Sequence, residues 1–320
     1  MCDDLDARSG SHLRNPAHLS DAADIAPKSS TLHKMLNGSQ KGQSTVPIDY
    51  VLDKVSQSLQ DIPGVQAIVL GGSRARGTHS AQSDIDIGIY YDATELDLAQ
   101  LKKCAHELDD DSRDELIAAP GEWGEWINGG GWLVIGGHHV DLILRETARV
   151  ATELDNCHVG RVTAHYQPGH PHAYINAMYV GELAISRVLW DGTGEVTRLK
   201  SGAEAYPAEL KAALVNFFRF EAGFSAMFAS ANADKADPYY VHAHVTRAVS
   251  CLNQVLFALN EQYCINEKKA VQMIDSFPIS PAHYQDRIAE LFTASVQDLM
   301  ATCGLLDTLI DETQALIDNQ

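Results

Sequence analysis

Apolar residues recur with a different period in the two halves of this chain. In the first half, apolar residues four positions apart over residues 48–59 predict an amphipathic helix. Residues 65–70 form a short run rich in β-branched residues, and residues 84–91 alternate strictly between polar and apolar side chains. Residues 132–135 and 140–144 are apolar runs separated by glycines and histidines, which predicts two strands joined as a hairpin.

In the second half the apolar spacing becomes helical. Three-to-four-residue spacing predicts helices over residues 174–190, 208–230, 238–262 and 281–316. We therefore expect an α+β protein, with a small mixed β-sheet and flanking helices in residues 46–150 and an all-helical bundle in residues 151–320. Residues 1–45 are rich in serine, aspartate, asparagine and glycine and show no sustained period, so we expect a poorly ordered tail.

The charge balance narrows the classes of partner. The 320 residues carry 24 Lys and Arg against 43 Asp and Glu, a net charge of -19. A protein that grips nucleic acid needs a basic surface, so we expect no nucleic-acid partner. A cationic small substrate or a metal-bound nucleotide is compatible with the charge.

Compartment signals point to the cytoplasm. No apolar run approaches the roughly 18 residues of a membrane span, and the first residues lack the basic and apolar regions of a signal peptide. The six cysteines are scattered without a C-x-x-C pair, which is typical of reduced thiols in the cytoplasm. We expect no membrane partner.

One stretch combines acids in a pattern suited to metal binding. Asp84 and Asp86 lie two apart on the alternating strand, so both carboxylates leave the same face. Two like charges this close are unfavourable unless a cation lies between them. Asp141 lies inside the later apolar run and offers a third carboxylate. Rigidly held carboxylate oxygens are ligands that Mg²⁺ prefers.

Phosphate-binding groups precede these acids. The glycines at positions 71 and 72 allow the backbone to approach a ligand closely, and Ser73 adds a hydroxyl. Arg74 and Arg76 offer charge-assisted hydrogen bonds to phosphate oxygens. Carboxylates for metal together with such a turn indicate metal-assisted phosphoryl or nucleotidyl transfer.

This arrangement resembles the nucleotidyltransferase superfamily, which includes DNA polymerase beta and kanamycin nucleotidyltransferase. Gly72-Ser73, a ten-residue spacer, and Asp84-Ile85-Asp86-Ile87 follow the family pattern over residues 46–150. The resemblance implies that Asp84, Asp86 and Asp141 hold two Mg²⁺ ions around a nucleoside triphosphate. Segments such as GEWGEWINGGGWL also resemble a group of uncharacterised bacterial nucleotidyltransferase-domain proteins, a resemblance that implies no substrate.

The helical half supplies further candidates. In aminoglycoside-modifying relatives an acid of the helical domain acts as general base, and Glu182 is the candidate here, with Asp141 as the alternative. Helical domains of the superfamily often contribute a lysine to the phosphates. Lys268 is the first candidate for this role and Lys269 the second, whereas an exposed polar turn is the alternative interpretation of both.

Aromatic and histidine residues leave two questions open. Trp123 and Trp126, in a glycine-rich segment, are either an aromatic wall for a ligand or loop anchors that pack on the core. The pairs His170/His172 and His242/His244 lack further ligands at zinc spacing, so we expect no zinc site.

The function we expect is Mg²⁺-dependent transfer of a nucleoside monophosphate from a triphosphate, with ATP the expected donor. The acceptor is a hydroxyl or similar group of a small molecule, for which the acidic charge balance fits a polycation, and pyrophosphate is released. Two alternatives stay open, namely AMP transfer to a protein acceptor and a catalytically silent, nucleotide-binding regulatory protein.

Overall fold

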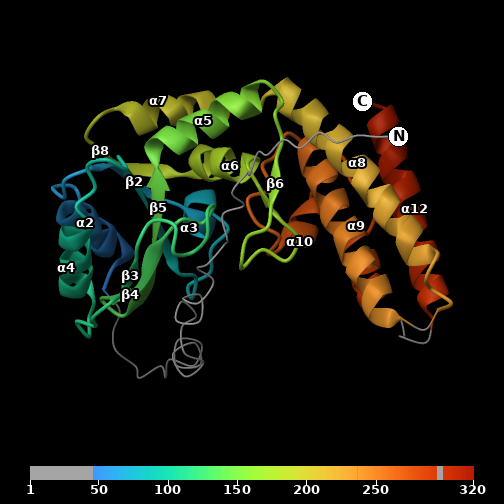
Figure 1. The fold of residues 1–320 in the computed structure, drawn as a ribbon, viewed down its shortest axis with the longest axis horizontal. Helices are drawn as coiled ribbons and strands as arrows, with labels where there is room; N and C mark the ends of the chain where they lie inside the picture. Colours follow the sequence, from blue (N-terminus) through green and yellow to red (C-terminus); the bar gives the residue numbers. More distant parts are fainter. Residues whose placement is uncertain (1–45, 236, 294–297) are drawn as a thin grey trace, which may run out of the picture. The chain divides into compact units, whose positions relative to one another are not determined.

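The computed structural model describes residues 46–235, 237–293 and 298–320 (Figure 1). The tail expected over residues 1–45 lies outside the described residues.

A six-stranded mixed sheet forms the centre of the first part, in the order β3-β4-β5-β2-β1-β8. Strands β2 and β5 pair in parallel, and the other neighbouring strands pair antiparallel. The sheet strands are β1 (Val65–Leu70), β2 (Ile85–Tyr91), β3 (Ile117–Ala118), β4 (Gly130–Ile135), β5 (His138–Glu146) and β8 (Arg187–Asp191). The expected α+β class, with a small mixed sheet and a helical second part, is confirmed.

One face of the sheet is covered by two amphipathic helices, α2 (Ile48–Leu59) and α4 (Leu98–Leu108). Ile85, Ile87 and Ile89 of β2 point to this face and are fully buried with the apolar sides of both helices. Because side chains alternate along a strand, the acidic positions of β2 face the opposite side. The packing of the buried isoleucines therefore holds β2 in place, with its acidic side chains on the opposite face.

The predicted hairpin is present in the structure, whereas the helix predicted over residues 174–190 is shorter than expected. Strands β4 and β5 form the predicted hairpin, and Gly136 and Gly137 adopt φ angles of 58° and 78°, as a two-residue type I′ turn requires. The helix predicted over residues 174–190 is shorter, because α6 (Ala177–Ile185) ends at Ser186. The following residues form β8, which pairs with β1 at the edge of the sheet.

The second part is helical. Helices α8 and α9 lie side by side, and α12 packs against both (Figure 1). On α8, Phe218 is buried, whereas Phe217, Phe220 and Phe224 are exposed. The elements of this part are α5 (Thr147–His158), β6 (Ala164–His165), β7 (Tyr174–Ile175), α6, α7 (Glu195–Glu204), α8 (Ala208–Ser230), α9 (Pro238–Leu259), α10 (Ala270–Ile274), α11 (Tyr284–Thr293) and α12 (Leu299–Asp318).

Within the described part of the chain, no helix combines the length and the apolar composition that crossing a bilayer requires.

Candidate functional site

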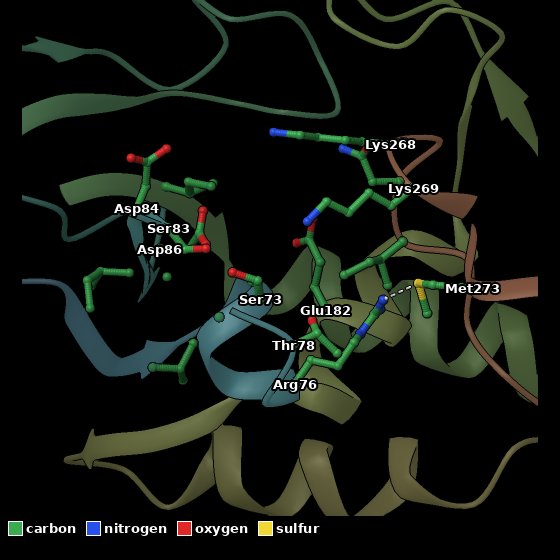
Figure 2. Close-up of a pocket in the computed structure, with 18 of the residues that line it drawn as sticks. Ser73, Arg76, Thr78, Ser83, Asp84, Asp86, Glu182, Lys268, Lys269 and Met273 are labelled. Atoms are coloured by element: carbon green, nitrogen blue, oxygen red, sulfur yellow. Dashed lines mark hydrogen bonds between the residues drawn. The ribbon is translucent and has the colours of Figure 1, made fainter. Parts of the chain in front are cut away.

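A cavity of about 980 Å³ lies between the polar face of the sheet and the loop that precedes α10. Figure 2 shows Asp84, Asp86 and Ser73 along one side of this space and Lys268 and Lys269 along another. The cavity collects seven of the nine residues predicted for the site, which are Gly72, Ser73, Arg76, Asp84, Asp86, Glu182 and Lys268. Asp141 and Arg74 are not among the described residues that line it.

The three predicted carboxylates belong to two adjacent parallel strands. Asp86 of β2 is the direct register partner of Asp141 of β5, and Asp84 lies two residues before Asp86. Burial, followed by the charges of Asp84 and Glu182, raises the pKa of Asp86 to about 6. Burial, followed by the charges of Asp86 and Asp84, raises the pKa of Asp141 to about 7. Burial and the repulsion among these acids therefore raise the two pKa values by more than the nearby cationic side chains lower them.

The donor set fits a divalent metal. Carboxylate oxygens from rigid strands suit Mg²⁺, which takes hard oxygen ligands and shares its remaining positions with water and phosphate. The raised pKa values of Asp86 and Asp141 have the same physical cause, namely buried negative charge, and a bound cation would remove it. On these observations the residues present fit the metal that the resemblance implies.

The turn at Gly71 and Gly72 packs directly against Asp86. The backbone N–H of Gly71 donates to the Asp86 carbonyl at 2.8 Å, just before the short helix α3 (Gly72–Arg76). Gly72 has a φ of +58°, and a Cβ there would lie 1.8 Å from Oδ2 of Asp86. Only glycine fits between the turn and this carboxylate, which explains how Ser73 reaches the cavity beside Asp86.

The two arginines of this segment have different surroundings. Arg74 donates to the carbonyls of Asp84 and Ser83 at 3.0 and 2.5 Å, so its guanidinium braces the loop before β2. Arg76 lines the cavity, and its Nη1 lies 3.1 Å from the Met273 Sδ atom on α10. Burial lowers the pKa of Arg76. Of the two arginines, Arg76 is the one that lines the cavity.

Lys268 faces the carboxylates from the loop after α9. Its charge lowers the pKa of both Asp86 and Asp141, in opposition to the effect of burial. The Asn266 side chain accepts from the Lys268 backbone N–H at 2.7 Å, and Lys269 adopts a left-handed φ of 65° at the start of α10. A strained backbone next to a cavity is often part of a binding site.

Glu182 lines the cavity but is already paired. Arg145 donates from Nε and Nη2 to the two carboxylate oxygens of Glu182 at 2.8 and 3.0 Å. The Arg145 side chain is 3% exposed, and although burial opposes its charge, Glu182 holds the pKa of Arg145 above its ordinary value. Arg145 was not among the predicted site residues, although a charged residue four positions after Asp141, on the same face of an apolar strand, is a detectable signal.

The tryptophans behave as loop anchors. Trp126 is buried and stacks on His165 and Tyr174, with ring centroids 4.1 and 5.5 Å apart. Trp123 stacks on Trp132 at 4.5 Å. Neither tryptophan is among the described residues that line the cavity, so the aromatic-wall alternative lacks support.

Two family models match the chain. Residues 52–156 match the nucleotidyltransferase domain, and residues 175–268 match a domain of unknown function, DUF4037. No curated protein matches. A solved structure of a nucleotidyltransferase-like protein from Exiguobacterium sibiricum 255-15 aligns with 85% of this chain and 78% of its own, at 10% identity and a TM-score of 0.41. The first match contains the glycine turn and all three carboxylates, and the superfamily resemblance is confirmed.

Proposed function

We propose that this chain, a member of the nucleotidyltransferase superfamily through its residues 52–156, moves a nucleoside monophosphate from a triphosphate to a small molecule. The observation that carries the proposal is the register of Asp86 and Asp141 on adjacent parallel strands, with Asp84 beside them. A purely structural role does not account for three mutually repelling carboxylates, two of which line a large cavity. A metal-bound triphosphate does account for them.

The reaction forms one bond and breaks one bond. A hydroxyl or similar group of the acceptor attacks the α-phosphorus, the bond from that phosphorus to the bridging oxygen breaks, and pyrophosphate leaves. Asp84, Asp86 and Asp141 would hold two Mg²⁺ ions. When bound, these ions supply positive charge to the attacking and leaving oxygens. Holding both substrates in line supplies a further part of the acceleration.

The phosphates are bound from two sides of the cavity. The turn at Gly72 and Ser73 brings backbone N–H groups and a hydroxyl close to the metal ligands. Lys268 and Arg76 add positive charge from the loop before α10 and from α3. Arg74 acts at one remove, because its hydrogen bonds hold the backbone of Ser83 and Asp84 in place.

We propose Asp141 rather than Glu182 as the general base, because Glu182 is already paired with Arg145. Both Glu182 oxygens accept hydrogen bonds from the buried Arg145, so both are engaged in the ion pair. Asp141 lies in register with Asp86, beside the other two acids. Glu182 then acts as a positioning residue through Arg145.

The acceptor that we propose is a small molecule, and a net charge of -19 favours a cationic one over nucleic acid. A cavity of about 980 Å³ has the size of small-molecule and cofactor sites. We propose ATP as the donor and the cytoplasm as the location, since the five cysteines of the described residues are all unpaired.

The test is pyrophosphate release from ATP, GTP, CTP and UTP with Mg²⁺, across a panel of amino- and hydroxyl-bearing small molecules. We compare the wild type with Asp84→Asn and with Asp53→Asn, an exposed acid on α2, as matched control. We expect release in the wild type and the control, and its loss in Asp84→Asn. Calorimetric titration of each triphosphate runs in parallel.

Each outcome separates the candidates. Metal-dependent triphosphate binding, with no transfer to any small molecule and no transfer of label from radioactive ATP to any protein, would favour the regulatory alternative. Label transferred to a protein would favour the protein acceptor. A folded wild type that binds no triphosphate would contradict the proposal.

A further inference from the structure

A second group of metal-ligating side chains lies in the helical part. His172 lies in the segment before β7, Glu221 on α8 and Cys251 on α9, and one ligand atom from each lies within 4.8 Å of the others. The Nε2 atom of His172 is 3.6 Å from Oε1 of Glu221 and 3.9 Å from Sγ of Cys251. None of the three is among the described residues that line the nucleotide cavity.

These separations are close to those of a tetrahedral metal centre. With metal–nitrogen and metal–oxygen bonds of about 2.0–2.1 Å and a metal–sulfur bond of about 2.3 Å, tetrahedral angles place two ligand atoms roughly 3.3–3.5 Å apart. The 3.6 and 3.9 Å separations at His172 exceed that range by a few tenths of an ångström. The third separation, between Glu221 and Cys251, is within 4.8 Å, and side-chain rotations would have to close it to bring all three ligands to bonding distance.

We propose that His172, Glu221 and Cys251 form a Zn²⁺ site whose fourth position is taken by water. One imidazole nitrogen, one carboxylate oxygen and one sulfur are a mixed set that Zn²⁺ accepts and that Mg²⁺ does not favour. With a thiolate and a carboxylate the two charges of Zn²⁺ are balanced. We infer this site without relying on the proposed nucleotidyl transfer.

The three side chains are largely shielded from solvent, as expected for the ligands of a tightly bound ion. Cys251 is fully buried, and the side chains of His172 and Glu221 are 7% and 18% exposed. Burial raises the pKa of the Cys251 thiol above its usual range, so binding of the ion must release that proton. The Phe218 ring packs edge-on against His172 and restricts its orientation.

Arg247 is the one nearby cation among the described residues around this cluster. It donates to Oε1 of Glu221 at 2.5 Å, while 55% of its own side chain is exposed. A hydrogen bond to a ligating carboxylate commonly orients it, so Arg247 can keep this contact when Glu221 binds the ion. The exposed side of Arg247 and Glu221 gives the ion a route from solvent.

The cluster lies close to the loop that carries Lys268. The His170 side chain and the His172 backbone N–H both bind Glu267, at 2.9 and 3.4 Å. Glu267 directly precedes Lys268 in the sequence, and Lys268 lines the cavity. A bound ion would therefore link the segment that contains His170 and His172 to α8 and α9. Through the contacts of this segment with Glu267, it would also restrict the motion of the loop that carries Lys268.

The experiment uses the full chain, freed of metal with a chelator and then titrated with Co²⁺ and with Zn²⁺ in excess Mg²⁺, which saturates the carboxylate site. We expect one equivalent of Co²⁺ to give visible bands of tetrahedral coordination and a near-ultraviolet thiolate-to-cobalt band. One equivalent of Zn²⁺ should abolish both bands. Cys251→Ser should remove the thiolate band, and both Cys251→Ser and His172→Gln should weaken Zn²⁺ binding more than about 100-fold.

The matched control is Cys303→Ser, another buried cysteine, on α12, which should keep the thiolate band and the affinity. A wild type that shows no thiolate-to-cobalt band would overturn the proposal without any variant having to fold. A band that persists in folded Cys251→Ser would place the ion on another cysteine and would also overturn it. Should Cys251→Ser not fold, the same measurement is made on His172→Gln and Glu221→Gln.

Discussion

Arg145 and Glu182 form a two-fold hydrogen-bonded ion pair, at 2.8 and 3.0 Å, between the strand that carries Asp141 and helix α6. Arg145 also donates to the carbonyls of Ile127 and Leu144 and lies over the Tyr179 ring. A buried guanidinium with this many partners has little freedom to move. The pair therefore links the acidic face of the sheet to helix α6.

Removal of one partner should be costly. We expect Glu182→Ala to lower the free energy of unfolding by about 3–5 kcal/mol, because Arg145 would remain buried and charged without its partner. Glu195→Ala is the matched control, since Glu195 pairs with Arg198 at the surface and should contribute less than about 1 kcal/mol. Urea denaturation of both variants measures the difference, and equal effects would show that the Arg145 pair is not held as described.

The same pair predicts how the two base candidates differ in turnover. Glu182→Gln keeps an acceptor for Arg145, so we expect most of the turnover to survive. Asp141→Asn removes the favoured base and a metal ligand, and general-base loss alone costs about 100-fold or more. Turnover of each folded variant at saturating Mg²⁺ and triphosphate is the measurement, and a larger loss in Glu182→Gln would restore Glu182 as the base.

Gly72 offers a test of the turn. We expect Gly72→Ala to abolish metal-dependent triphosphate binding, because the added Cβ would lie 1.8 Å from Oδ2 of Asp86. Gly77→Ala is the control: Gly77 also has a positive φ, +78°, but nothing lies within 4 Å of its added Cβ. Both variants carry the backbone cost of about 1–2 kcal/mol, and only Gly72→Ala should lose binding in calorimetric titration. Retained binding in Gly72→Ala would show that the turn tolerates displacement.

Local patterns were sufficient to identify the two strands that carry the acids. The alternation around Asp84 and Asp86 and the apolar run around Asp141 each identified a strand. That these strands are parallel neighbours in register could not be read from either pattern, because register is set by long-range pairing. The family resemblance supplied only the expectation that Asp141 shares a metal site with Asp84 and Asp86, and the structure places Asp86 and Asp141 opposite each other.

Features that depend on tertiary contacts could not be predicted in this way. Residues 187–191 have the pattern of a helix end, yet they pair with β1 because that edge of the sheet was open. Arg74 was expected at the phosphates, but nearby carbonyls of its own loop engage its guanidinium. The His172–Cys251 contact joins residues 79 positions apart, a spacing that no zinc pattern contains.

The acidic cluster should make the metal-free protein less stable as the pH rises. In the folded chain the pKa values of Asp86 and Asp141 are raised to about 6 and about 7, from an ordinary 3.8. The folded state therefore binds more protons than the unfolded state, so their contribution to stability is fully present below about pH 4 and is lost as the pH rises through 6 and 7. For each carboxyl, a tenfold difference in proton affinity between the folded and unfolded states corresponds to about 1.4 kcal/mol.

Mg²⁺ should reverse this loss, because it balances the same charges. Urea denaturation between pH 4 and pH 8, with a chelator and with Mg²⁺, measures both effects. The control is the double variant Asp86→Asn and Asp141→Asn, in which we expect a flatter pH profile and little response to Mg²⁺. A wild-type profile that matches the double variant would mean that these acids ionise freely in the metal-free fold.

Lys268 should modulate both the acids and the nucleotide. Its charge lowers the pKa of Asp86 and Asp141, so Lys268→Met should raise both pKa values further and move the pH-dependent loss of stability to higher pH. The lost charge-assisted contact should also weaken triphosphate binding about ten-fold or more. Lys269→Met is the matched control, since Lys269 lines the cavity without affecting the pKa of either acid. Chelator-treated samples give the pH profiles and calorimetry gives the affinities. Identical pH profiles of stability for the two lysine variants would contradict this prediction. They would mean that the Lys268 amine is too far from the carboxylates for its charge to change their pKa values.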